Sequence, residues 1–136
     1  MIWRPDSEIW FADQQTASDY VDQAGVRVIL AVAHDLDICP NAYHVPFFRF
    51  PIQDNTQLDS NIMAMPVCIA ETLLASSIKP LLFMCRAGLS RSASFTALII
   101  ARSRHISWND ACCRVRTARP EVFPHPSFTE QFRKLA

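Results

Sequence analysis

The sequence predicts an α/β domain of three layers, with a mostly parallel central sheet of about four to five strands between two layers of helices. Three observations predict this fold. Short apolar runs rich in β-branched and aromatic residues recur along the first two thirds of the 136-residue chain. Helical patterns separate these runs, and two further helical patterns follow them. Strands that alternate with helices favour a parallel sheet covered on both faces.

The individual elements follow from local patterns. The expected strands lie at 9–12, 26–33, 45–52 and 81–84. A first helix would begin at Thr16 or Ser18 and end near Gly25, and a second would run from Ser60 to about 77 through Pro66. The third helix would start near Ser92, and its apolar residues lie all around it, which predicts a buried helix. Two capping boxes, Ser107-x-x-Asp110 and Ser127-x-x-Glu130, predict the last two helices.

Length and composition limit the organisation of the chain. The 136 residues suffice for a single domain over 1–136, and an apolar content of 50% is enough to bury a core. The longest stretches without a charged residue, 38–48 and 60–70, are too short for a membrane span. No secretory leader is recognisable, and five cysteines, an odd number, suit a reducing compartment. We therefore expect a cytoplasmic protein without a membrane partner.

The charge is unevenly distributed along the chain. Thirteen basic and 13 acidic residues cancel, which argues against nucleic acid as a partner. Residues 1–60 nevertheless carry a net charge of −6 and residues 61–136 a net charge of +6. An anion would prefer the second half, unless folding mixes the two halves and the asymmetry serves solubility alone. Eleven of the 13 basic residues are arginine, which favours bidentate recognition of oxyanions.

One segment of the basic half carries the pattern of a reactive site. After the strand that ends near Cys85, a short loop containing Gly88 leads to Arg91 and an apolar helix. Backbone N–H groups in such a loop, together with the helix dipole, form a cradle for phosphate or sulfate. A thiol at the base of the cradle is favoured as thiolate and becomes a nucleophile. Arg91 would hold two oxygens of the anion.

Spacing alone would not justify this interpretation, because Cys113 and Arg119 have the same separation as Cys85 and Arg91. No strand precedes Cys113, no glycine lies between it and Arg119, and the cysteine falls in an amphipathic helix closed by Pro120. The surrounding pattern therefore favours the first pair as the reactive one.

The segment around Cys85 resembles the cysteine-dependent protein tyrosine phosphatases, specifically their small dual-specificity branch, with the signature H-C-x-x-G-x-x-R-S/T. Cys85, Gly88, Arg91 and Ser92 match it, and F-P-I-Q-D-N-T-Q and R-P-E-V-F-P-H-P-S-F-T-E-Q-F resemble further segments of that branch. The resemblance implies the tyrosine phosphatase fold and a phosphorylated protein or small phosphomonoester as substrate, with no cofactor. It implies that Cys85 attacks phosphorus, that Ser92 steadies the thiolate leaving group, and that Arg91 and the loop amides hold the oxyanion. The phosphate-binding residues would be Arg86, Ala87, Gly88, Leu89, Ser90 and Arg91.

Residue 84 departs from this signature, because methionine stands where the family has histidine. Methionine cannot hydrogen-bond the loop as histidine does, so we expect a slower enzyme. One alternative function is a phosphate-binding module that recognises phosphorylated partners without turnover. Another is sulfur transfer or arsenate reduction from a similar cysteine loop.

A phosphatase of this kind needs a general acid on a neighbouring loop. Asp35 and Asp37 follow the second expected strand, Asp54 follows the third, and Asp59 comes shortly after. The residues leave these candidates open, and the family resemblance selects Asp54. Its alternative interpretation is a turn or capping residue.

The remaining candidate residues are expected to be structural. His34, Cys39 and His44 lack the spacing of a metal site, so no metal is predicted. Cys112 and Cys113 are expected to be small core residues, with a redox partnership to Cys85 as the alternative. The sequence indicates no oligomeric state.

Overall fold

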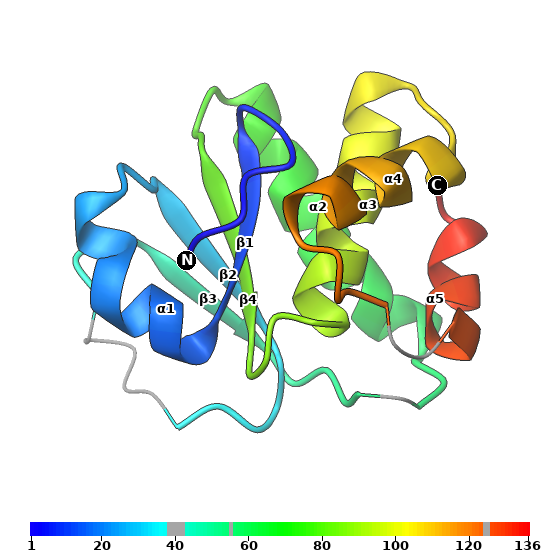
Figure 1. Cartoon of the computed structure of the whole chain (residues 1–136), viewed down its shortest axis with the longest axis horizontal. Coiled ribbons are helices and arrows are strands. Elements are labelled where there is room, and N and C mark those ends of the chain that lie inside the picture. Colours follow the sequence, from blue (N-terminus) through cyan, green and yellow to red (C-terminus); the bar gives the residue numbers. More distant parts are fainter. Residues whose placement is uncertain (38–42, 55, 124–125) are drawn as a thin grey trace.

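Four parallel strands form the centre of the molecule (Figure 1). A computed structural model describes residues 1–37, 43–54, 56–123 and 126–136, with side chains left out for 126–128. Its strand order is β1-β4-β2-β3, which confirms the expected parallel α/β sheet. In chain order the elements are β1 (Ile9–Asp13), α1 (Gln14–Tyr20), the 3₁₀ turn η1 (Val21–Gln23), β2 (Val28–Val32), β3 (Phe47–Phe50), α2 (Ser60–Ala75), β4 (Leu81–Cys85), α3 (Arg91–Arg104), α4 (Trp108–Ala118) and α5 (Pro126–Arg133).

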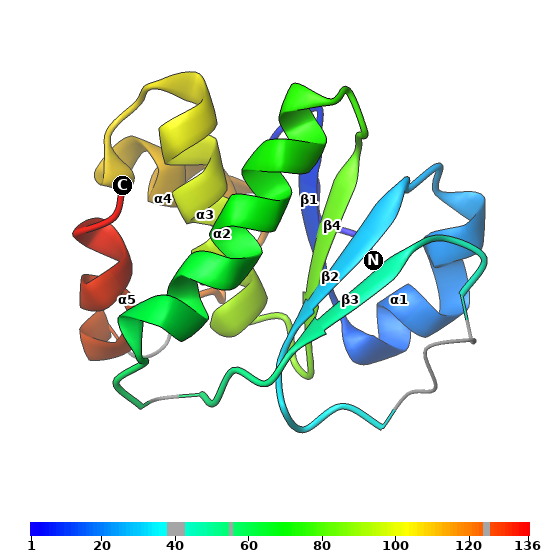
Figure 2. The ribbon, with the colours of Figure 1, turned by 180° about the vertical axis from the view of Figure 1, so that it is seen from behind.

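The sheet is covered unequally on its two faces. Figures 1 and 2 show α1 on one face and the four later helices on the other. Alternate strand residues point to opposite faces, as the period of two in a strand requires. Phe11, Leu30 and Phe83 belong to the core beneath the later helices, whereas Ala12, Ala31 and Met84 belong to the smaller core beneath α1. The three-layer arrangement follows from this alternation.

The third strand is shorter than the sequence pattern predicts. Pro46 and Pro51 flank β3, and proline has no N–H to donate to a sheet ladder. The expected strand over 45–52 is therefore reduced to Phe47–Phe50.

In two helices the cap is an aspartate that precedes the predicted capping residue. The Asp13 carboxylate accepts the Thr16 N–H at 2.6 Å, so α1 starts before both Thr16 and Ser18. Asp59, not Ser60, caps α2. The Ser107 cap of α4 is confirmed, since its hydroxyl accepts the Asp110 N–H at 3.0 Å.

The last helix also differs from its prediction at the start. It begins at Pro126, so Ser127 lies inside α5 rather than at its cap. Proline is favoured in the first turn because its missing N–H has no partner there anyway. The predicted capping box at Ser127 is therefore wrong.

The buried third helix is confirmed. Every residue of α3 from Arg91 to Ala101 is buried, and the helix packs against β1, β4, α2, α4 and α5. A helix held from several sides gives the loop before it a rigid support. This support fixes the N-terminal end of α3 at the carboxyl edge of the sheet.

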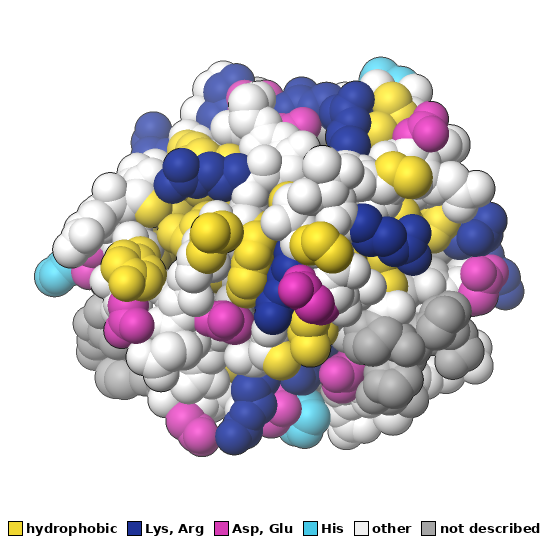
Figure 3. Space-filling view, viewed as in Figure 1, with side chains coloured by type: hydrophobic (Ala, Val, Ile, Leu, Met, Phe, Trp, Pro, Cys, Tyr) yellow, Lys and Arg dark blue, Asp and Glu magenta, His cyan; other side chains and the backbone are white. Residues whose placement is uncertain are grey.

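Folding brings the acidic and basic parts of the chain together. Arg104 bonds Asp6 at 2.8 Å and Glu8 at 2.7 Å, and Lys79 forms an ion pair with Glu8. On the face seen in Figure 3, basic and acidic side chains are interspersed. None of the helices in the described part of the chain has the length and apolar content needed to span a bilayer.

Candidate active site

The candidate site lies where β4 ends and α3 begins. Cys85 is the last residue of β4, residues 86–90 form a loop, and Arg91 opens α3. The loop lies at the carboxyl edge of the parallel sheet, the edge at which such folds bind ligands (Figure 1). Since both flanking elements are buried, their packing fixes the two ends of the loop.

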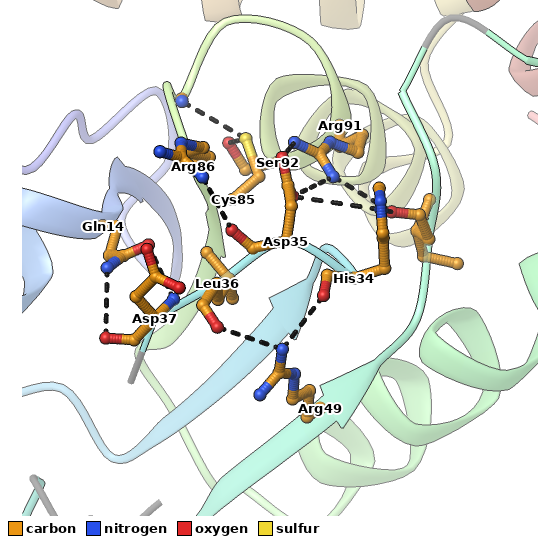
Figure 4. Close-up of polar contacts among 12 residues, drawn as sticks. Gln14, His34, Asp35, Leu36, Asp37, Arg49, Cys85, Arg86, Arg91 and Ser92 are labelled. Atoms are coloured by element: carbon orange, nitrogen blue, oxygen red, sulfur yellow. Dashed lines mark hydrogen bonds and ion pairs between the residues drawn. The ribbon is translucent and has the colours of Figure 1, made fainter. Parts of the chain in front are cut away.

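The Cys85 sulfur lies among hydrogen-bonding groups rather than in a purely apolar environment. The residue is 2% exposed, and its Sγ lies 3.1 Å from the Ser92 hydroxyl oxygen. The Gly88 backbone N–H donates to the same sulfur at 3.2 Å. The sulfur therefore has one backbone donor and one neighbouring hydroxyl that can either donate or accept. The predicted nucleophile and its predicted partner Ser92 are thus in contact (Figure 4).

Three residues outside the loop donate hydrogen bonds to the loop carbonyls. A carbonyl and the N–H of the same trans peptide point in opposite directions, so each outside contact turns the following N–H toward the inside of the loop. This arrangement orients the amides of residues 87–90 as an oxyanion cradle requires. The contacts are Gln14 N–H to the Arg86 carbonyl at 3.2 Å, Arg119 Nη1 to the Ala87 and Gly88 carbonyls at 2.8 and 2.9 Å, and Phe123 N–H to the Leu89 carbonyl at 2.9 Å.

Gly88 occupies the tightest point of the loop. Its φ is +69°, a conformation that side chains with a Cβ rarely adopt. A Cβ at this position would lie 2.9 Å from Arg119 Nη1 and 3.0 Å from both the Asp13 nitrogen and the Trp3 ring. Both the backbone conformation and the available space therefore require glycine.

Arg91 is the buried cation of the site. It is 3% exposed, its Nη1 and Nη2 bond the Asp35 carboxylate at 2.7 and 3.3 Å, and Nη1 also donates to the Ile52 carbonyl at 3.0 Å. Its Nε is buried and has no hydrogen-bond partner among the described residues. A buried N–H without a partner is costly, and an anion in the cradle would supply one.

The remaining loop side chains differ in exposure. Arg86 is exposed, and its Nη1 reaches the Asp35 carbonyl at 3.2 Å (Figure 4). Leu89 is half-buried, while Ser90 is buried and its hydroxyl has no hydrogen-bond partner within the described ranges. Arg86 is therefore the loop side chain available to a substrate at the rim.

The four candidate general acids fall into different surroundings. Hydrogen bonds from Arg91, and the charge of that guanidinium, hold the pKa of the Asp35 carboxyl below its ordinary value. Asp35 is therefore ionised near neutral pH and carries no proton to donate. Asp59 caps α2 by accepting the Asn61 and Ile62 amides at 2.8 and 3.3 Å. Asp37 and Asp54 therefore remain the two candidates for the general acid.

The segment of Asp54 is tied to the site from both sides. Upstream, the Ile52 carbonyl accepts from Arg91. Downstream, the Gln131 amide of α5 donates to the Thr56 carbonyl at 3.1 Å and accepts the Leu58 N–H at 2.8 Å. Asp54 itself is half-buried between these two anchors.

Met84 is buried in the core beneath α1. Its sulfur lies 3.9 Å from the Tyr43 hydroxyl, which in turn lies 3.3 Å from the Ser18 hydroxyl. A thioether is a weak acceptor, so this contact contributes less than a histidine at the same place could.

Of the other residues singled out in the sequence, His34 contacts the Ile52 carbonyl and the Asp35 carboxylate, which also bind Arg91. His34 Nδ1 lies 3.2 Å from the Ile52 carbonyl, His44 is exposed beside Asp22, and Cys39 lies outside the described residues. Within the described ranges, no three His, Cys, Asp or Glu side chains are grouped to hold a metal ion. Burial raises the pKa of the Cys112 thiol to about 11, which argues against a redox role. Cys113 is exposed rather than a core residue, so that expectation is wrong.

Sequence reasoning missed the residues that hold the loop from outside. In the sequence, Arg119 stands out only as half of a chance spacing, and no local pattern marks Trp3 or Gln14. Their contacts join the ends of distant elements, and no local pattern signals such contacts. The R-P pair of the family-like C-terminal segment, Arg119-Pro120, was the available signal.

A buried thiol under inward-facing amides, beside an arginine, defines an oxyanion-binding cysteine loop on a parallel sheet. The comparisons with known proteins agree with this class. The family model described as "Dual specificity phosphatase, catalytic domain" matches residues 9–136. The chain therefore belongs to the dual specificity phosphatase family.

Individual relatives give the same result. Human dual specificity phosphatase 28 is 30% identical over 118 residues, covering 87% of this chain and 66% of the relative. The Drosophila melanogaster dual specificity protein phosphatase Mpk3 is 31% identical over 120 residues, covering 84% of this chain but only 28% of its own length. The crystal structure of human DUSP28 superposes with a TM-score of 0.82 at 26% identity, covering 98% of this chain and 91% of that one.

Proposed function

We propose that this protein is a metal-independent phosphomonoester hydrolase that works through a cysteinyl-phosphate intermediate on phosphotyrosine-containing proteins or small aryl phosphates. The contact of the Cys85 sulfur with both the Gly88 N–H and the Ser92 hydroxyl is the observation that carries the proposal. The names of the relatives, dual specificity phosphatases, support the same reaction class. Four free thiols in the described residues support a reducing, cytoplasmic setting.

The first chemical step transfers the phosphoryl group to sulfur. The Cys85 thiolate attacks phosphorus, the S–P bond forms and the ester P–O bond breaks. Asp54 donates a proton to the leaving oxygen, while the loop amides and Arg91 hold the three phosphoryl oxygens. The products are the dephosphorylated alcohol and a phosphocysteine.

The second step returns the enzyme to its starting state. The Asp54 carboxylate takes a proton from water, whose oxygen attacks phosphorus, and the S–P bond breaks. The Ser92 hydroxyl donates to the departing thiolate, since its oxygen already lies 3.1 Å from the sulfur. Inorganic phosphate leaves, and both Cys85 and Asp54 regain their original protonation states.

The nucleophile is tested with two cysteine variants. We expect Cys85→Ser to hydrolyse an aryl phosphate in EDTA at less than about one thousandth of the wild-type rate, because a hydroxyl is a much weaker nucleophile. Cys113→Ser, which alters an exposed cysteine at the same spacing from an arginine, should stay within about twofold of wild type, as expected for a surface site. Retained activity in Cys85→Ser would refute the mechanism. Binding of a phosphopeptide without phosphate release by the wild-type chain would favour the phosphate-binding module.

The general acid is tested with two aspartate variants. Asp54→Asn should lower kcat by roughly 10²-fold with little change in KM, because the amide cannot donate the proton as a carboxylic acid does. Asp59→Asn should leave kcat unchanged and cost at most about 1 kcal/mol of stability, since it alters only a helix cap. An unchanged kcat in Asp54→Asn would transfer the role to Asp37. A panel of phosphotyrosine, phosphothreonine, phosphoinositide and RNA 5′-phosphate would define the substrate class.

A further inference from the structure

Arg119 lies immediately outside the cysteine loop, although it belongs to a different part of the chain. It follows the last residue of α4, and its side chain is 18% exposed. Its guanidinium carbon lies 3.9 Å from the centre of the Trp3 ring, and its Nε lies 3.7 Å from the Glu121 carboxylate. These contacts hold the guanidinium in a narrow space between the Trp3 ring and the loop backbone.

The cation acts on a single peptide unit that also contacts the nucleophile. Arg119 Nη1 donates to the Ala87 carbonyl at 2.8 Å, and the N–H of the same peptide, that of Gly88, donates to the Cys85 sulfur at 3.2 Å. The guanidinium, the peptide and the sulfur therefore form one chain of hydrogen bonds. The second contact of Nη1, to the Gly88 carbonyl at 2.9 Å, fixes the neighbouring peptide in the same way.

Hydrogen bonds in series polarise one another. A cation at the carbonyl oxygen draws electron density toward that end of the peptide and makes the N–H at the other end a stronger donor. A stronger donor favours a negatively charged acceptor over a neutral one. The thiolate of Cys85 gains from this effect, whereas the thiol gains little.

We propose that Arg119 is a positioning residue that increases the thiolate fraction of Cys85 through the peptide between Ala87 and Gly88, with Trp3 holding its guanidinium in place. The inference rests on the proposed role of Cys85 as nucleophile.

Several other charged groups lie around the same loop and must be kept constant in a test. Arg91 lies at the start of α3, Asp35 pairs with it, and Arg86 lies within the loop. Other charged or titratable groups on the surrounding segments include Asp13 at the end of β1, His34 beside Asp35, Asp37 beside Gln14, Tyr43 beside Met84, Asp54 after β3, and Glu121 beside Arg119. None of these residues is changed in the variants below.

The experiment measures the reactivity of Cys85 directly, without turnover. The full-length protein is treated with iodoacetate at pH 4.5 to 9, and alkylation of residue 85 is quantified by mass spectrometry of its peptide. Arg119→Met removes the charge and the donor but keeps an unbranched side chain, and Arg119→Lys keeps both. As the matched control, Arg114→Ala removes an exposed arginine from α4, the helix that Arg119 follows.

We expect the pH midpoint of alkylation to move upward in Arg119→Met. Alkylation at pH 5.5 should be about threefold to tenfold slower than in wild type, which is the size of effect expected when a charge-assisted hydrogen bond is lost. Arg119→Lys should stay within about twofold of the wild-type alkylation rate, because lysine keeps a cation near the Ala87 carbonyl. Arg114→Ala should also stay within about twofold, because it leaves the whole contact of Arg119 in place. An unchanged midpoint in Arg119→Met would overturn the inference. An equal shift in Arg114→Ala would also overturn it, since net charge alone would then explain the effect.

Two further measurements keep the result interpretable. If thermal unfolding shows that Arg119→Met does not fold, Trp3→Leu is used in its place. Trp3→Leu should move the alkylation midpoint in the same direction by a smaller amount. An unchanged midpoint in Trp3→Leu would overturn the inference. Hydrolysis by Cys85→Ser tests the proposed function separately. Activity in that variant would refute the nucleophile, whereas the alkylation midpoint reports on Arg119 whether or not the chain turns over substrate.

Discussion

Two segments of this protein carry a cysteine and an arginine at identical separation, and they do entirely different things. Between Cys85 and Arg91 the chain leaves a strand, curls through a loop and enters a helix, so both side chains lie at one edge of the sheet. Between Cys113 and Arg119 the chain is mostly helical, with the cysteine exposed and the arginine just past the helix end. Residues six apart on a helix do not share a face. Whether a cysteine and an arginine form a site therefore depends more on the backbone conformation between them than on their spacing in the sequence.

The second segment nevertheless contributes to the first. Arg91 lies on the inner side of the loop with Asp35, whereas Arg119 contacts the loop carbonyls from outside. Arg91 keeps a buried Nε without a partner among the described residues, whereas Arg119 bonds the loop backbone through Nη1 and lies over the Trp3 ring. The same residue type thus serves as a ligand-binding group in one segment and as a support in the other.

The largest difference between the segments should appear when each arginine is replaced by lysine. Arg91→Lys should lower kcat/KM for an aryl phosphate by about 10³-fold, because lysine cannot reproduce the planar fork that holds two oxygens. Arg119→Lys should lose no more than about twofold, since it still places a cation at the carbonyls. Steady-state kinetics on both variants provide the measurement, and equal losses would show that the two arginines are not functionally distinct.

A smaller effect is expected from the two glycines, which both have positive φ but differ in the space around them. Gly88→Ala should reduce kcat/KM by about 10²-fold and the free energy of unfolding by about 2 kcal/mol, because the backbone is strained and the new methyl group meets Arg119, Trp3 and Asp13. Gly25→Ala, with φ +80° and no atom within 4 Å of the added Cβ, should cost about 1 kcal/mol and leave kcat/KM unchanged. Steady-state kinetics and urea denaturation of the two variants test these expectations. Equal losses of kcat/KM in Gly88→Ala and Gly25→Ala would contradict the role of the packed loop.

The smallest effect concerns the ion pair on the inner side of the loop. Arg91 holds the pKa of Asp35 below its ordinary value, so the pair stabilises the folded state above the unfolded pKa of about 3.9. This stabilisation is lost as the pH falls through the lowered pKa of the folded state. Asp35→Asn should therefore be less stable than wild type by about 1 kcal/mol at pH 7, and the difference should shrink below about pH 4.

Thermal unfolding of wild type and Asp35→Asn between pH 3 and 7 measures this difference. Asp37→Asn is the matched control, because the backbone of Asp37 makes its contacts to Gln14. A stability difference that does not depend on pH would show that the carboxylate charge of Asp35 is not responsible.

Local patterns were sufficient for much of the fold and for the central part of the site. Alternating apolar runs predicted the strands, and the all-round apolar pattern after Ser92 predicted the burial of α3, because these features depend on nearby residues. The helix starts at Asp13 and Asp59 were missed, since several capping residues compete within a few positions. The contacts of Arg119, Asp35 and Gln131 join residues distant in sequence, and only the packed structure brings them together.

The position of Trp3 has a consequence for how this protein can be shortened. The family match begins at residue 9, yet Trp3 covers the outer edge of β1 through backbone bonds to Phe11 at 2.9 and 3.0 Å and carries Arg119 on its ring. A version trimmed to the matched region would expose an unpaired strand edge to other molecules. It would also leave the guanidinium hydrated and free to swing away from the loop. The few residues before the recognised catalytic region therefore pack against the support of the cysteine loop, through the contact of Trp3 with Arg119.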